Sequence, residues 1–302
     1  MGRYLERTEN TARLIEAGFR MALTRAQGGE EEWGSVITTA GAREEYLEKH
    51  EEIRGDKVTD FLLRDKESSI SILNVLQQAR ENARMTRTAL TREVWEAINE
   101  FWMNMQTRLR RTTPESELPD LLVSIRQQAA QVRGAIMGTM LRNDIFNFVA
   151  LGVQVERADN TARILDAKYY VLLPSGASFG SSLDNVQWEM ILRAASAQRS
   201  FHWLHGGDTT PYAIANFLIF DTRLPRSLAY CNDMIVAELE ALALFYGIRA
   251  EAHDLAAAQE SSLSSGTIED VFEGGLHEFL TGFLSRNGTL SRQIEIDYRF
   301  YE

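Results

Sequence analysis

The sequence predicts an all-α protein, and three observations support this class. The chain has only five prolines among its 302 residues, and long stretches rich in Glu, Ala, Leu and Arg separate them. Val, Ile and Thr do not alternate with polar residues at the two-residue period of a β-strand. A 16-residue motif also occurs twice, 150 residues apart, and its first copy has a helical pattern. We therefore expect a helical bundle built from two pseudo-symmetric repeats.

The first half of the chain is predicted to form six helices. They cover residues 2–27, 31–52, 58–64, 68–84, a segment that begins at 91, and 119–138. In the first of them, apolar residues such as Leu5 and Ile15 fall on one side of the helix, and Gly28 ends it. Ser68 and Thr91 are good N-caps for later helices. Residues 114–119, which begin and end with proline, form the predicted connection between the last two helices.

The second half is predicted to form a matching set of helices. They cover residues 144–172, 184–204, 211–219, 225–246, 250–264 and 268–285. Pro211 and Pro225 favour helix starts, because proline is tolerated in the first turn. Gly247 favours a helix end. Residues 174–182 are rich in Ser and Gly and predict a loop.

The repeated motif covers Gly2–Ala17 and Gly152–Ala167, and 8 of its 16 positions are identical. Two further blocks keep the same order: one begins at Trp33 and Trp188, and the other at Phe61 and Phe217. This pattern indicates duplication. We expect one domain over residues 1–302, with repeat one at 1–138 and repeat two at 139–302. Neither repeat is expected to cover its apolar face alone, so the two should form one body with pseudo-twofold symmetry.

Charged positions carry the strongest functional signal, because a solvated face gives duplicated charges no reason to persist. The identical polar pairs are Glu6/Glu156, Arg7/Arg157, Asn10/Asn160 and Arg13/Arg163, and Glu9 is matched by Asp159. One interpretation is a structural network that pairs the arginines with carboxylates. Another is a ligand cleft, in which the arginines hold a carboxylate or phosphate. In a cleft, Glu6 and Glu156 are the candidate catalytic residues. The other motif residues are then candidate ligand-binding residues.

A second group of candidate ligand-binding residues is Arg80, Asn82 and Arg84, whose arginines lie at helical spacing. The corresponding stretch of the second repeat lacks these arginines. That asymmetry suits a single binding site in one half of the molecule. It equally suits an exposed helix with many salt bridges.

Composition and motifs exclude several classes of function. The net charge of −11 argues against binding to nucleic acid or to an anionic membrane. No stretch approaches the roughly 20 apolar residues of a membrane span, and no secretory signal is present, so we expect a cytoplasmic protein. The chain has one cysteine, no Glu-x-x-His motif and no nucleotide-binding fingerprint, so no metal or cofactor is expected.

The motif Gly2–Arg13, together with Ala79–Arg84 and Phe217–Ser227, resembles the bacterial alpha-E domain family over essentially the whole chain. The resemblance implies an all-helical fold. Family members usually begin some residues earlier, so we expect the first helix to be shortened at its start. Genes of the family neighbour ATP-grasp ligases, transglutaminase-like peptidases and proteasome-like subunits. The resemblance therefore implies a role in making or processing a peptide or amide-linked product, with no catalytic role established for any residue.

Three functional hypotheses follow. The leading one is an accessory helical protein that binds an ATP-grasp amide ligase, or a peptide or small anionic ligand, at the repeated polar face. The alternative is an enzyme of amide transfer or hydrolysis, with Glu6 and Glu156 as acid and base and with Arg13 and Arg163 binding substrate. The third is a structural oligomerisation module. The sequence decides neither whether the chain is an enzyme nor its oligomeric state.

Overall fold

The computed structural model describes residues 1–23, 29–171, 182–206 and 209–300. Every regular element among these residues is a helix, which confirms the predicted all-α class. The chain divides into two compact units, Met1–Val149 and Ala150–Glu302. Each unit is described separately below. The repeat boundary after residue 138, and a pseudo-twofold relation between the repeats, stay predictions.

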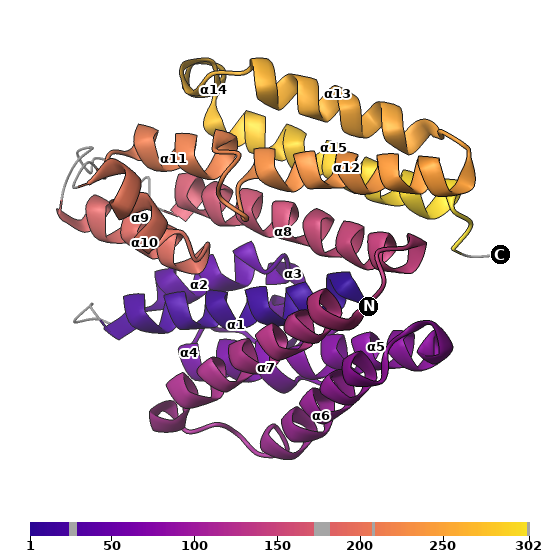
Figure 1. Cartoon of the computed structure of the whole chain (residues 1–302). Helices are drawn as coiled ribbons and strands as arrows, with labels where there is room; N and C mark the ends of the chain where they lie inside the picture. Colours follow the sequence, from indigo (N-terminus) through magenta and orange to yellow (C-terminus); the bar gives the residue numbers. More distant parts are fainter. Residues whose placement is uncertain (24–28, 172–181, 207–208, 301–302) are drawn as a thin grey trace. The chain divides into compact units, whose positions relative to one another are not determined.

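The first unit is a bundle of four long helices with shorter helices beside it (Figure 1). Its elements are α1 (Gly2–Leu23), α2 (Glu30–Thr39), α3 (Arg43–Lys49), α4 (Gly55–Arg64), α5 (Ile72–Met85), η1 (Arg87–Ala89), α6 (Arg92–Arg108), η2 (Glu115–Glu117) and α7 (Leu118–Thr139). Helix α1 packs against α5 and α7, and α6 packs against the same two helices. Fully buried side chains from three of these helices, including Ile15, Leu76 and Ile98, form the core.

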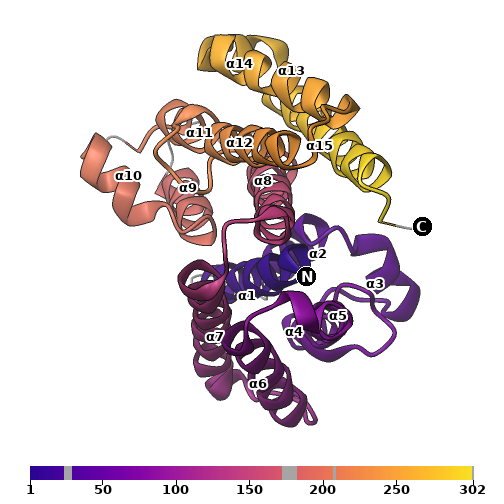
Figure 2. The same ribbon diagram turned by 45° about the vertical axis from the view of Figure 1, so that its right-hand side comes forward.

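The second unit has a similar succession of helices (Figure 2). Its elements are α8 (Asp144–Val171, of which residues 150–171 belong to this unit), α9 (Ser182–Ala194), α10 (Gln198–His205), α11 (Pro211–Phe220), α12 (Leu228–Tyr246), α13 (Glu251–Ser265), α14 (Ile268–Gly274) and α15 (Leu276–Asp297). Helix α13 packs against both α12 and α15, and α11 packs against α12. Phe217, Ile235 and Phe283 are among the buried core residues.

Three of the predicted long helices are each two helices in the structure. The break falls at Gly41 between α2 and α3, at Ser196 between α9 and α10, and at Gly275 between α14 and α15. These residues have φ values of 73°, 56° and 95°, so the backbone leaves the right-handed helix there. The predicted ends at 27 and 172, and the loop at 174–182 apart from Ser182, lie outside the described residues.

Of the four helix starts predicted from a capping residue or a proline, two are correct and two are wrong. Thr91 and Thr210 are N-caps whose hydroxyls accept backbone N–H bonds, and Pro211 opens α11. The cap of α5 is Ser71 instead of Ser68, and α12 begins after Ser227 instead of at Pro225. In both cases a short connection follows the preceding helix, and the serine at its end supplies the cap.

Candidate functional site

In the first unit, the motif residues of α1 form an ionic network with α7. The Glu9 carboxylate is 1% exposed and accepts hydrogen bonds from both Arg13 (Nη2–Oε1, 2.7 Å) and Arg133 (Nη1–Oε2, 2.7 Å). The same Nη1 atom of Arg133 lies 3.6 Å from Oε2 of Glu6, which is also buried. Arg133 therefore bridges two buried motif carboxylates from the neighbouring helix, and pairing of this kind lets charges be buried.

A second ion pair repeats this arrangement one heptad further along. Arg126 lies seven residues before Arg133 on α7, and its Nη1 is 3.2 Å from Oε2 of Glu16, which lies seven residues after Glu9 on α1. The two pairs show that α1 and α7 run antiparallel with matched charges. The sequence analysis did not identify Arg126 or Arg133. The signal that could have found them is the shared seven-residue spacing of opposite charges on the two helices.

In the second unit, the equivalent motif residues of α8 have different partners. Arg163 forms a two-point hydrogen bond with Asp159, at 2.7 and 3.4 Å. Arg157 donates to the carbonyl oxygen of Pro225 at 3.2 Å, and the hydroxyl of Thr161 donates to that of Arg226 at 2.8 Å. These bonds tie α8 to the connection that precedes α12.

Helix α15 also contacts α8, at both ends of the motif. The amide of Asn287 donates to the carbonyl oxygen of Val155 at 3.1 Å. Nδ1 of His277 lies 2.6 Å from Oδ1 of Asp166, which is the residue that matches Glu16 in the repeat. The carboxylate at this motif position is thus paired in both units, with an arginine in one and a histidine in the other.

The candidate motif residues are buried or half-buried in both units. Glu6, Glu9, Asn10, Glu156 and Arg157 are buried, and the rest of the candidate motif residues are half-buried: Arg7, Arg13, Asp159, Asn160 and Arg163. No motif residue lines any of the three cavities described within the units. The structure brings Glu6, Glu9 and Arg13 into one network in the first unit and pairs Asp159 with Arg163 in the second. A ligand-binding or catalytic role for these residues stays a prediction.

Within the second candidate group, Arg80 connects α5 to α6, whereas the contacts of Arg84 and Asn82 are local. The Arg80 guanidinium lies 4.3 Å from the centroid of the Trp102 ring, and its Nε donates to Asn99 at 2.8 Å. Arg84, which is largely exposed, pairs with Glu81 at 2.9 Å. Asn82 accepts a bond from the Thr86 hydroxyl through its backbone carbonyl. These contacts fit the interpretation as an exposed helix stabilised by salt bridges.

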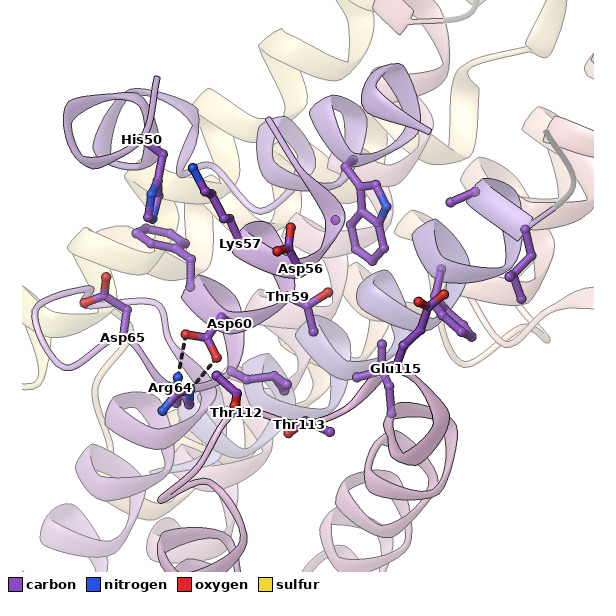
Figure 3. Close-up of a pocket in the computed structure, with 18 of the residues that line it drawn as sticks. His50, Asp56, Lys57, Thr59, Asp60, Arg64, Asp65, Thr112, Thr113 and Glu115 are labelled. Carbon is purple, nitrogen blue, oxygen red and sulfur yellow. Dashed lines mark hydrogen bonds and ion pairs between the residues drawn. The ribbon is translucent and has the colours of Figure 1, made fainter. Parts of the chain in front are cut away.

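A groove of about 760 Å³ lies along α4 in the first unit (Figure 3). Asp56, Thr59, Asp60 and Arg64 line it, at spacings that place them on one face of α4. Trp33, which is buried, and Phe61 supply an apolar part of the lining. The volume falls in the range of small-ligand sites, about 300–1,000 Å³. Sequence analysis missed this groove, because its walls come from segments far apart in the chain.

The aspartates of the groove are already paired with cations. Asp60 pairs with Arg64, Arg54 lies 3.0 Å from Asp56, and Lys49 lies 3.1 Å from Asp65. The Arg54 guanidinium holds the pKa of Asp56 below its usual range. Burial opposes a low pKa for Asp65, but the N–H of Glu67 and the ammonium of Lys49 outweigh it and lower that pKa.

The second unit has a cavity beside α11, the helix that the sequence repeat aligns with α4. It measures about 540 Å³ and lies between α11, the counterpart of α4, and the connection from α13 to α14. Its lining includes Tyr212, Asn216, Phe220, Thr267 and Glu269 and contains no lysine or arginine. Each unit therefore has its own cavity beside the aligned helix. Of these two cavities, only the one in the first unit has lysine and arginine side chains in its lining.

The described residues contain no group of three or more His, Cys, Asp or Glu side chains placed to hold a metal ion. Among these same residues, no helix is both long enough and apolar enough to cross a membrane.

These features define a helical-bundle protein in which a repeated ionic motif lies within the fold. The chain belongs to the Alpha-E family, described as a predicted alpha-helical domain with a conserved ER motif, and the family model matches residues 1–298. Only two Glu-Arg dipeptides occur in the sequence, Glu6-Arg7 and Glu156-Arg157, and they occupy equivalent positions of the two motif copies. No curated protein and no solved structure matches the chain.

Proposed function

We propose that this protein is an accessory, partner-binding helical protein that works with an ATP-grasp amide ligase in making or processing a peptide-like product. The ligase as a partner comes from the family resemblance. The role as a binding protein is inferred from the geometry of the candidate functional site. In an accessory protein the motif would fix the fold, and the surface and the groove would provide the binding functions.

The observation that supports this proposal best is the pairing of Glu9. Its two carboxylate oxygens accept bonds from Arg13 and from Arg133, both at 2.7 Å. A catalytic carboxylate must reach a substrate, whereas this one is buried and engaged by two guanidinium groups. The pairing of Glu9 thus favours a structural ion-pair network over catalysis at this motif position.

The test is co-purification of the full-length protein with an ATP-grasp ligase of the kind whose genes neighbour those of the family. We expect a complex that survives size-exclusion chromatography, and a change in the rate at which the ligase hydrolyses ATP when the protein is added. Absence of a complex, together with an unchanged ligase rate, would overturn the proposal. Arg92→Ala is a suitable control variant, because Arg92 is exposed and pairs only locally with Glu96 among the described residues.

The acid–base enzyme is the weaker candidate. It requires Glu6 and Glu156 to act on a substrate bound by Arg13 and Arg163, yet the described partner of Arg163 is Asp159 and that of Arg13 is Glu9. Glu6→Gln and Glu156→Gln separate the candidates. An enzyme would lose amide-transfer or hydrolytic turnover with little loss of stability, whereas a structural network would lose stability instead.

A further inference from the structure

We propose that the groove along α4 binds an extended, acidic peptide segment of about four to five residues. The proposal rests on the proposed function for the origin of such a peptide. Its physical basis is independent of any ligase and consists of the length of the groove, the open backbone along one wall and the distribution of lysine in this chain.

The length of the groove fits an extended chain. Helix α4 has ten residues, which corresponds to about 15 Å along its axis. The α4 residues that line the groove begin at its first residue, Gly55, and the lining continues past the end of the helix to Lys66. An extended peptide advances about 3.3–3.6 Å per residue, so four to five residues span this distance.

The wall opposite α4 offers backbone groups. Thr112 and Thr113 line the groove and lie between α6 and η2 (Figure 3). Among the described residues, neither residue has a backbone N–H or C=O in a hydrogen bond. Pro114 follows and disfavours helical backbone at Thr113. A second cavity, of about 250 Å³, is also lined by these two threonines. An extended peptide can pair with an open segment of this kind through its main chain.

Charge selects the kind of peptide. Lysine is rare in this chain, with four among its 32 cationic residues, and three of the four lie in or beside the groove: Lys49, Lys57 and Lys66. Lys49 is paired with Asp65, but Lys57 and Lys66 have no ion pair within the described part of the chain. Each groove aspartate has a cationic partner, although Lys49 also pairs with Glu67, and Glu115 is the one lining carboxylate without an ion pair among the described residues. Two available ammonium groups against one carboxylate favour an acidic ligand.

The ends of the groove set the spacing of the acidic groups. Lys57 lies in the first turn of α4 and Lys66 just beyond its last turn, so their positions are nine residues apart. The two lysines therefore stand near opposite ends of α4, whose axis is about 15 Å long, and carboxylates about four residues apart on an extended peptide span a similar length. An apolar side chain between them can contact the Trp33 and Phe61 part of the lining.

The duplication provides an internal control. At the offset of 156 residues that aligns Phe61 with Phe217, Lys57 corresponds to Ala213 and Lys66 to Thr222. Both lysines are thus absent from the second unit, whose equivalent cavity has no basic residue in its lining. We infer one peptide site per chain, located in the first unit.

The experiment is calorimetric titration of the full-length protein, without ligase, with the peptide acetyl-Glu-Ala-Leu-Ala-Glu-amide. We expect a stoichiometry of one, and roughly tenfold weaker binding to the double variant Lys57→Ala and Lys66→Thr, which installs the residues of the second unit. The Arg92→Ala variant removes a cation elsewhere and should bind as the unchanged protein does.

Two further peptides test the mode of binding without altering the protein. The charge-reversed peptide acetyl-Lys-Ala-Leu-Ala-Lys-amide and a copy of the acidic peptide with methylated backbone nitrogens should both bind at least about tenfold more weakly. Equal binding of the charge-reversed peptide, unchanged binding by the double variant, or no heat at about 1 mM acidic peptide would each overturn the inference. Because no ligase is present, such a result leaves the proposed ligase partnership to be judged by co-purification.

Discussion

The two motif helices keep the same residues but use different partners. In the first unit, Glu9 on α1 is bound by a guanidinium from α7, through Arg133. In the second unit, Arg157 and Thr161 on α8 donate to backbone carbonyl oxygens of the connection before α12. Both arrangements bury the motif and attach its helix to a neighbouring segment. The comparison supports our proposal that the motif serves as a structural anchor, and it shows that the contacting groups on the neighbouring segments differ between the units.

The second unit lacks a counterpart of Arg133 for an identifiable reason. Arg126 pairs with Glu16 as His277 pairs with Asp166, which aligns α7 with α15. Seven residues after Arg126 stands Arg133, but seven residues after His277 stands Leu284. At this aligned position, therefore, the second unit has a leucine in place of the cross-helix cation.

The largest expected effect follows from removing that cation. Arg133→Met should lower the free energy of unfolding by about 2–3 kcal/mol, because it takes one partner away from two buried carboxylates. This is less than for a fully buried pair, since the Arg133 side chain is 37% exposed. Urea unfolding at neutral pH measures the change. The matched variant Leu284→Met should cost less than about 1.5 kcal/mol, and equal losses in the two variants would contradict the asymmetry.

The next effect concerns the wall of the groove in the first unit. A Cβ added at Gly55 would lie 2.4 Å from Nε1 of the buried Trp33, so Gly55→Ala should cost about 1–3 kcal/mol and change the tryptophan fluorescence. The corresponding position in the second unit is Pro211, which shows that glycine is not required to start this helix. Gly138→Ala is the control, because a Cβ there meets nothing within 4 Å and should stabilise α7. A neutral Gly55→Ala variant would refute the close packing.

Acid should destabilise both units through equivalent aspartates. Hydrogen bonds from Arg223 lower the pKa of Asp221, and the N–H of Glu67 with the ammonium of Lys49 overcome burial to lower that of Asp65. A carboxyl with a depressed pKa in the folded state contributes stability above its unfolded pKa of about 3.9, and this is lost as the pH falls through the folded pKa. Asp65→Asn and Asp221→Asn should therefore lower stability at pH 7 and flatten its decline below about pH 4. If the melting temperatures of the two variants fell below about pH 4 as steeply as that of the unchanged protein, this explanation would be contradicted.

The smallest effects come from the helix caps that follow these aspartates. Ser71 caps α5 and Ser227 caps α12, and both serines are fully buried. The Ser227 hydroxyl also donates to the carbonyl oxygen of Asp221 at 2.6 Å. Ser71→Ala should cost about 1 kcal/mol, and Ser227→Ala should cost up to about 2 kcal/mol because it removes both bonds. Chemical unfolding of the two variants side by side decides whether the order holds.

Much of the fold could be predicted from the sequence, because apolar spacing and capping residues are local signals. Thr91, Pro211 and Gly247 marked helix ends correctly for this reason. The break at Ser196 was missed because a serine gives no local sign of left-handed backbone. Gly41 and Gly275 did carry such a sign, since glycine favours helix ends.

The sequence identified only part of the candidate site. Duplication identified the motif residues, but their partners come from tertiary packing. Arg133 lies 124 residues from Glu9, and the carbonyl oxygens of Pro225 and Arg226 have no side-chain signature. The groove was invisible for the same reason: α4 and Thr112–Thr113 meet only once the bundle has formed.

The most direct test of the central claim, that the motif is a structural anchor, is a double-mutant cycle with Glu9→Gln and Arg133→Met. Urea unfolding of the single and double variants gives the coupling free energy between the two side chains. The account predicts a favourable coupling of about 1–3 kcal/mol. A coupling within about 0.3 kcal/mol of zero would contradict it.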